Sequence, residues 1–118
     1  MPIVFLNQTE LPAGEFSREL EGETLGIPAS VIFVDAAPDE GPSLHAHAYA
    51  ELFFVLEGEA CFNDGTNERT VGAGSVVIVP PGQPHAFVNP GPGRLRQIDV
   101  HLSGRFATRW LTDTSPSL

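Results

Sequence analysis

The sequence predicts an all-β protein folded as an antiparallel sandwich or barrel. Short runs of β-branched and aromatic residues are interrupted, roughly every eight to twelve residues, by Gly, Pro, Asn or Asp, which is typical of such folds. The 118 residues include 12 Gly and 11 Pro, enough for many tight turns. No stretch shows a long helical period, and the length suits one domain.

Each expected strand is an apolar or β-branched run bounded by turn residues. Asp64 and Gly65 favour a hairpin turn between two of these runs, because Gly accepts the positive φ that such turns need. The segment RFATRWL, residues 105–111, is a candidate for one short helix. The expected strands are Ile3–Leu6, Ser30–Asp35, Glu51–Leu56, Glu59–Asn63, Glu68–Val71, Ser75–Val79, His85–Asn89 and Leu95–Leu102.

The run Glu51–Leu56 carries apolar residues on both of its faces. Phe53 and Val55 point to one side, and Phe54 and Leu56 point to the other. In a small barrel one of these faces lines the interior, so the outward face needs cover. We expect a second subunit to supply it and form a homodimer. Cover by the chain's own N-terminal segment is the alternative.

Composition restricts the possible partners. The formal net charge is −9, the sequence pI is about 4.6, and there are only six Lys and Arg residues. Nucleic acids and anionic membranes are therefore unlikely partners, because both need clustered basic residues. The single Cys cannot form an internal disulfide, and the longest apolar run, Leu52–Leu56, is too short to cross a bilayer. With no secretory pattern at the start, we expect a cytoplasmic protein.

One group of titratable residues stands directly before the apolar run. His45 and His47 are two positions apart, so both point to the same side of an extended chain, and Glu51 has the same parity. His85 follows the turn sequence VPPGQP. Three imidazoles and one carboxylate suit Mn, Fe, Co, Ni or Zn, and in octahedral geometry they leave two positions open. The pattern predicts a catalytic or ligand-binding metal site, whereas a His-x-His pair by itself is weak evidence.

The segments HAHAYAELFFVLEG and GSVVIVPPGQPHAFVN resemble, in residues and spacing, the two signature motifs of the cupin superfamily. One departure is Asp39, which stands where the first motif of the family begins with Gly. The resemblance implies a double-stranded β-helix, or jelly roll, that is usually dimeric. It places the barrel core at about 28–103, an N-terminal segment at 1–27 and a short tail at 104–118. It also implies one divalent metal ion bound by His45, His47, Glu51 and His85.

Residues with the same side-chain parity as the candidate ligands indicate the walls of a pocket. They are Phe53, Val55 and Phe87, with Tyr49 at the rim. Such walls favour an apolar or aromatic small molecule over a sugar. Some of these phenylalanines are alternatively ordinary core residues.

The run Leu95–Leu102 has two open interpretations. Gln97, Asp99 and His101 alternate with apolar residues and lie either on a solvated face or inside the barrel. Inside the barrel, Asp99 or His101 would be a general acid or base, or a partner of a metal ligand. The run also resembles the last strand of small cupins that open unsaturated uronate sugars, which use an Asp and a later Arg. Asp99 and Arg105 would match, but those enzymes have Gln in place of Glu51.

The cupin fold supports many activities, so function has to be argued from the site. The leading hypothesis is a metal-dependent, dioxygenase-like enzyme for a small apolar or enolisable molecule, with Glu51, Asp99 and His101 as candidate catalytic residues. A lyase, an isomerase or a sugar-ring-opening enzyme is an alternative. A non-catalytic sensor that uses the metal as an anchor is another, and a structural partner of a second protein is a third.

Overall fold

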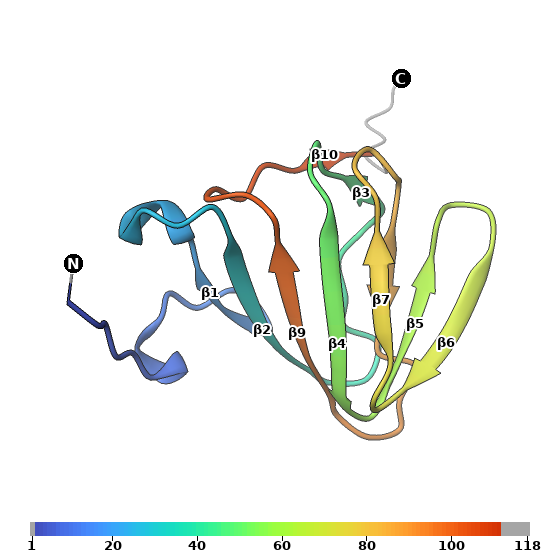
Figure 1. Cartoon of the computed structure of the whole chain (residues 1–118). Coiled ribbons are helices and arrows are strands. Elements are labelled where there is room, and N and C mark those ends of the chain that lie inside the picture. The colour runs from blue at the N-terminus through green and yellow to red at the C-terminus, as the bar shows by residue number, and fades with distance from the viewer. Residues whose placement is uncertain (1, 112–118) are drawn as a thin grey trace.

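The computed structural model describes residues 2–111, and in this part the chain is almost entirely strands and loops (Figure 1). Two short 3-10 turns, η1 (Gln8–Glu10) and η2 (Gly22–Leu25), are the only helical elements in the described range. None of its helices is long and apolar enough to cross a membrane. The strands are β1 (Ser17–Leu20), β2 (Ser30–Ala36), β3 (His45–Ala46), β4 (Glu51–Glu57), β5 (Glu59–Asn63), β6 (Glu68–Gly72), β7 (Val76–Val79), β8 (Ala86–Val88), β9 (Leu95–His101) and β10 (Arg109–Trp110).

The strands form an antiparallel jelly roll, which confirms the predicted fold class. One sheet has the order β1-β2-β9-β4-β7, a second has the order β6-β5-β8, and a third pairs β10 with β3. β9 therefore lies between β2 and β4, far from both in sequence. In Figure 1 the five-stranded sheet faces the viewer, and the β5–β6 hairpin extends to one side.

The core lies between the sheets and is built from the inward-facing positions of each strand. Along β9, the residues at alternate positions from Leu95 to His101 are buried, and the β4 residues from Glu51 to Val55 alternate in the same way. Phe53 packs edge-on against Phe62, with ring centroids 5.0 Å apart. Burying each such side chain contributes about 2–3 kcal/mol. The buried apolar residues are Val34, Ala36, Phe53, Val55, Ala60, Val79, Phe87 and Leu95.

Two expectations about the N-terminal part were wrong. Ile3–Leu6 lacks strand structure and is exposed, with Phe5 84% accessible. β1, which was not expected, pairs with β2 instead, with Ser17 opposite Val34. The apolar run had the right propensity for a strand, but a strand also needs a partner edge, and residues 17–20 occupy that edge.

The expected helix at 105–111 is also absent. The segment ends in β10, where Arg109 is paired with Ala46 and Trp110 with His45. Because β3 offers a free edge, its backbone bonds favour the extended form over a helix of two turns. This pairing holds the C-terminal segment against the strand that carries the first candidate ligand.

The loop before β3 contains Asp39 at the position where the first cupin motif has Gly, and Asp39 adopts a backbone conformation typical of Gly. Asp39 has φ +74°, the left-handed conformation that the family's Gly adopts readily and that Asp tolerates better than most residues. Its N–H donates to the carbonyl of Asn89 at 2.8 Å. Gly41 follows, and a Cβ there would lie 1.9 Å from the carbonyl oxygen of Phe87. Asp39 therefore adopts a backbone conformation that a Gly at this position could also adopt.

The outward face of the five-stranded sheet carries exposed apolar side chains, which are where we expect the homodimer to form. Val76 and Ile78 on β7 are 56% and 67% exposed, and Phe54 and Leu56 beside them on β4 are also exposed. A specific dimer buries about 800 Å² on each partner. We expect the purified protein to sediment as a dimer and the Ile78→Asp variant as a monomer.

Thr70→Asp is the matched control, because Thr70 is an exposed strand residue of β6, away from this face. It should leave the sedimentation coefficient unchanged. A wild-type protein that sediments as a monomer at micromolar concentration would contradict the expectation.

Candidate metal centre

Three separate parts of the chain bring the candidate ligands together. His45 lies on β3, His47 follows it, Glu51 begins β4, and His85 immediately precedes β8. The backbones of His45 and His85 exchange two hydrogen bonds, of 2.8 and 3.0 Å, which link the two predicted motifs directly. All four side chains are buried. The structure thus assembles the set that the spacing predicted.

The donor atoms have the spacing of ligands around one ion. One ligand atom from each residue lies within 4.8 Å of all the others. The Oε1 atom of Glu51 is 3.1 Å from His47 Nε2 and 3.0 Å from His85 Nε2. Around a metal ion with bonds of about 2.1 Å, neighbouring ligands at right angles lie about 3 Å apart and opposite ones about 4.2 Å apart. The four residues therefore fit a single transition-metal ion.

The hydrogen bonds of the three candidate histidines fix which ring nitrogen carries the proton. In each ring Nδ1 lies against a backbone carbonyl, which only accepts, so Nδ1 must donate. In the neutral ring Nε2 is then a free lone pair, and all three face the cluster. His47 Nε2 is buried without a hydrogen-bond partner. The carbonyls belong to Ser43, Ala107 and Gln83, at 2.7, 2.9 and 2.9 Å from His45, His47 and His85 respectively.

The electrostatics of the cluster favour an ionised Glu51 beside a neutral His45. Burial acts to raise the pKa of Glu51, but the adjacent imidazoles of His101, His47 and His85 outweigh it and hold the pKa well below its usual value. Burial lowers the pKa of His45 to about 4, and the nearby His85 and His47 act in the same direction. Burial also lowers the pKa of His47, but the Glu51 carboxylate and the Ala107 carbonyl outweigh it and raise this pKa above 6.5.

His101 reaches the same cluster from β9. In the sheet register it is the direct partner of Glu51, and its Nε2 lies 3.0 Å from Glu51 Oε2. Its Nδ1 is 2.8 Å from the hydroxyl of Tyr49. That hydroxyl accepts the N–H of Ala107 at 3.1 Å. Tyr49 was expected at the pocket rim, but its ring stacks on His47 with centroids 5.0 Å apart.

The structure decides between the two interpretations of β9. Gln97 and Asp99 are 1% and 3% exposed and point inside the barrel, as does His101. The Gln97 side-chain amide donates to Asp99 at 2.9 Å. Burial, helped by repulsion from Glu51 and opposed by the Gln97 hydrogen bond, raises the pKa of Asp99 well above its usual value. Asp99 therefore takes up a proton more readily than an ordinary aspartate.

A cavity of about 480 Å³ opens over the cluster, and residues far apart in sequence line it. Phe53 and Phe87 are among them as expected, whereas Val55 belongs to the core. Phe106 and Trp110 add two aromatic walls that sequence reasoning missed. Their place depends on the pairing of β10 with β3, for which the local sequence gave no signal.

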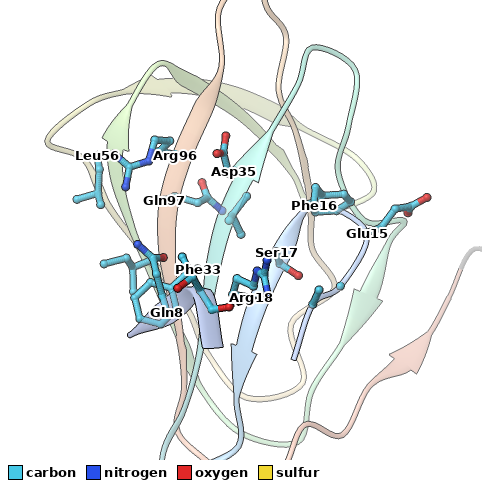
Figure 2. A pocket seen from close by; sticks show the side chains of 15 residues that line it. Gln8, Glu15, Phe16, Ser17, Arg18, Phe33, Asp35, Leu56, Arg96 and Gln97 are labelled. Atoms are coloured by element: carbon cyan, nitrogen blue, oxygen red, sulfur yellow. Dashed lines mark hydrogen bonds between the residues drawn. The ribbon is translucent and has the colours of Figure 1, made fainter. Parts of the chain in front are cut away.

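A second cavity, of about 500 Å³, lies where residues 8–18 cross β2 and β9, and it contains none of the four candidate ligands. Figure 2 shows Gln8 and Arg18 from the N-terminal segment facing Phe33 and Leu56 of the sheet. The N–H groups of Arg18 donate to the carbonyls of Thr9 and Leu11, so this arginine holds its own segment in place.

Comparison with known proteins agrees with the motifs. A family model described as "Cupin domain" matches residues 32–101, which is more than half of the chain. The chain belongs to the cupin family. The matched range contains all four candidate ligands and also Asp99 and His101. We found no match among curated protein sequences.

Solved structures with the same fold come from proteins of different activities. The polyketide cyclase RemF from Streptomyces resistomycificus has a TM-score of 0.75 and 19% identity, over 95% of this cupin and 89% of that chain. A cupin 2 conserved barrel domain protein from Salinispora arenicola has a TM-score of 0.68 and 25% identity, over 87% and 89%. An oxalate oxidase has a TM-score of 0.72 and 22% identity, over 97% and 68%.

Removal of one ligand tests the metal centre. In the His85→Ala variant we expect metal affinity to fall by more than about tenfold, because even the loss of a group behind a ligand costs 10- to 100-fold. The barrel should stay folded, since the two backbone bonds between His85 and His45 do not involve the side chain. Metal content measured by mass spectrometry and thermal unfolding by circular dichroism check the two parts.

Gln83→Ala is the control for this variant, because the exposed Gln83 side chain lies outside the cluster and its carbonyl is retained. It should keep the wild-type metal content. Unfolding of His85→Ala would mean that His85 is mainly structural.

Metal binding should weaken as the pH falls. A ligand nitrogen must be unprotonated, and the pKa of His47 lies above 6.5, so protons compete with the metal from about that pH downward. The lowered pKa of His45, about 4, keeps that ring available throughout the same range. Metal retention after dialysis at stepwise lower pH measures the effect. Retention that stays constant down to pH ~4 would contradict a site with three histidine ligands.

Proposed function

We propose that this cupin is a metal-dependent enzyme that acts on a small, uncharged aromatic or enolisable molecule. The observation that carries the proposal is the convergence of three imidazole lone pairs and one carboxylate oxygen at a cavity with aromatic walls. His45, His47, Glu51 and His85 would hold one Fe, Mn, Co, Ni or Zn ion. Such an ion supplies Lewis-acid polarisation of a substrate oxygen and, if it is Fe, O₂ chemistry.

The charge of the cavity argues for an uncharged substrate. The acidic side chains in its lining are Glu15 and Glu19 near the N-terminal segment and Glu51 and Asp99 further inside, and the lining contributed by residues 2–111 contains no Lys or Arg. A dicarboxylate would have to enter without a basic partner other than the metal ion. Although some structures with this fold are oxalate enzymes, including an oxalate oxidase in complex with glycolate, we do not propose oxalate as the substrate.

The walls of the cavity favour a planar ring. Phe53, Phe87, Phe106 and Trp110 line the cavity, and the centroid of the Trp110 ring lies 5.1 Å from that of His45. Aromatic side chains pack against a flat apolar ligand with a gain of about 0.5–1.5 kcal/mol per pair beyond the buried area. A phenol, a diketone or a similar enolisable compound presents both such a ring or plane and an oxygen for the metal.

Asp99 is the residue we propose as general acid. It lines the cavity, and its raised pKa favours the proton-bearing form. A neutral carboxyl group can donate this proton, or a hydrogen bond, to a substrate oxygen or carbon and take it back in a later step. Gln97 donates to Oδ1 of Asp99, so Oδ2 remains available to a ligand in the cavity that Asp99 lines.

A lyase, an isomerase or a non-catalytic sensor would use the same metal site, so turnover decides between these functions. The sugar-ring-opening alternative has less support, because Arg105 pairs with Glu23 on the surface at 2.7 Å, far from Asp99 in the barrel.

We would reconstitute the protein with each of the five metal ions and test diketones, flavonols and phenols, with oxalate as the control, for O₂ uptake and product. Tight binding without turnover would support the sensor.

The Asp99→Asn variant tests the general acid. The amide has nearly the same size and shape as the carboxyl group, so metal content and ligand binding should be unchanged. The kcat should fall by about 100-fold, because general acid catalysis typically contributes that much or more. Steady-state kinetics on the best substrate of the panel gives the result. An unchanged kcat would remove Asp99 from the mechanism.

A further inference from the structure

His101 is hydrogen-bonded differently from the other three histidines. Each of those donates from Nδ1 to a backbone carbonyl, whereas His101 Nδ1 faces the Tyr49 hydroxyl at 2.8 Å. Its Nε2 faces Glu51 Oε2 at 3.0 Å, on the side of the carboxylate opposite to His47 and His85. The ring is 3% exposed, so water does not replace these partners.

The hydrogen bonds that link Ala107, Tyr49, His101 and Glu51 each have a direction, which follows from the groups that can only donate or only accept. No carbonyl forces a hydrogen onto His101 Nδ1, because its partner is a hydroxyl that can donate, so His101 Nε2 can carry the hydrogen and donate it to the Glu51 carboxylate, which only accepts. In the neutral ring Nδ1 is then an acceptor, and the Tyr49 hydroxyl donates to it. The hydroxyl oxygen accepts the N–H of Ala107 at 3.1 Å, which completes the chain. In the reverse arrangement the Tyr49 hydroxyl would accept from both His101 and Ala107, and its own hydrogen would have no acceptor among residues 2–111.

We propose that Tyr49 and His101 are a positioning pair that holds Oε2 of Glu51, so that Glu51 binds the metal ion through Oε1 alone. Because its Nε2 carries a hydrogen, His101 itself is not a fifth ligand. A carboxylate that is free on both sides can bind a metal ion through two oxygens and occupy an extra position. The pair keeps that position open for the substrate. This inference rests on the metal-binding function proposed above.

Ala107 connects the pair to the ligand set. Its N–H binds the Tyr49 hydroxyl, and its carbonyl accepts from His47 Nδ1 at 2.9 Å. One peptide of the C-terminal segment therefore orients both a ligand and the chain that restrains Glu51. The His101 ring also packs edge-on against Phe106, with centroids 5.0 Å apart.

The first test uses the metal-free protein, so its outcome is independent of the proposed function. The sequence has four histidines, and ¹H–¹⁵N correlation spectra at a pH of about 8.5 show which nitrogen of each neutral ring is protonated. We expect an Nε2–H ring for His101 and Nδ1–H rings for the other three. In Tyr49→Phe, His101 should lose its fixed tautomer. An Nδ1–H ring at His101 in the wild type would overturn the proposal.

The second test measures coordination with Mn(II) as the probe. Water-proton relaxation counts the water molecules bound to Mn(II), and we expect His101→Leu to have one fewer than the wild type, because Oε2 becomes free to bind. His101→Gln, which retains an N–H donor, should restore the count. An unchanged count in His101→Leu would overturn the positioning role while the metal function stands. A wild type that binds no Mn(II), Fe(II), Co(II), Ni(II) or Zn(II) would overturn the metal function and the coordination role together, and the NMR result would still decide the hydrogen bonds.

Discussion

The buried carboxylate of Glu51 is the group on which the arrangement of the site depends. An ionised carboxylate inside a barrel costs several kcal/mol unless charge and hydrogen bonds compensate for it. Here two histidines face one oxygen and a third faces the other, all at about the same distance. The surrounding strands must hold these rings in place, so the register of β4 with β9 is fixed by chemistry as well as by packing.

The same register separates the two faces of the sheet. With Glu51 opposite His101 and Phe53 opposite Asp99, the inward positions of both strands carry the site and the core. A slip of one residue would send the entire inward set to the outer face. The outer positions carry Phe54 and Ile98, which are free of any role in the site. The candidate metal site and the surface of the expected dimer therefore lie on opposite faces of one sheet and place no conflicting demand on a single residue.

The part of the site that could be predicted from sequence is the part encoded by local spacing. His45 and His47 lie on the same side of the chain because side chains in a strand alternate with a period of two. The prolines and the glycine of VPPGQP indicate the turn before His85. The jelly roll followed from the same two motifs. Asp39 departs from the motif, yet it has φ +74°, a left-handed conformation that is typical of Gly and that Asp tolerates better than most residues.

The rest of the site depends on contacts between segments that are distant in sequence, and local sequence patterns do not predict such contacts. Ala107 meets His47 and Tyr49 across about 60 positions of sequence, and it does so because β10 pairs with β3. The sequence of 105–111 is compatible with a helix, and only the free edge of β3 makes it extended. That edge exists because β3 is the strand that delivers His45 to the cluster. The strand that places His45 thus also provides the edge with which β10 pairs. This pairing brings Ala107 to His47, so residues 105–111 contribute to the candidate metal centre.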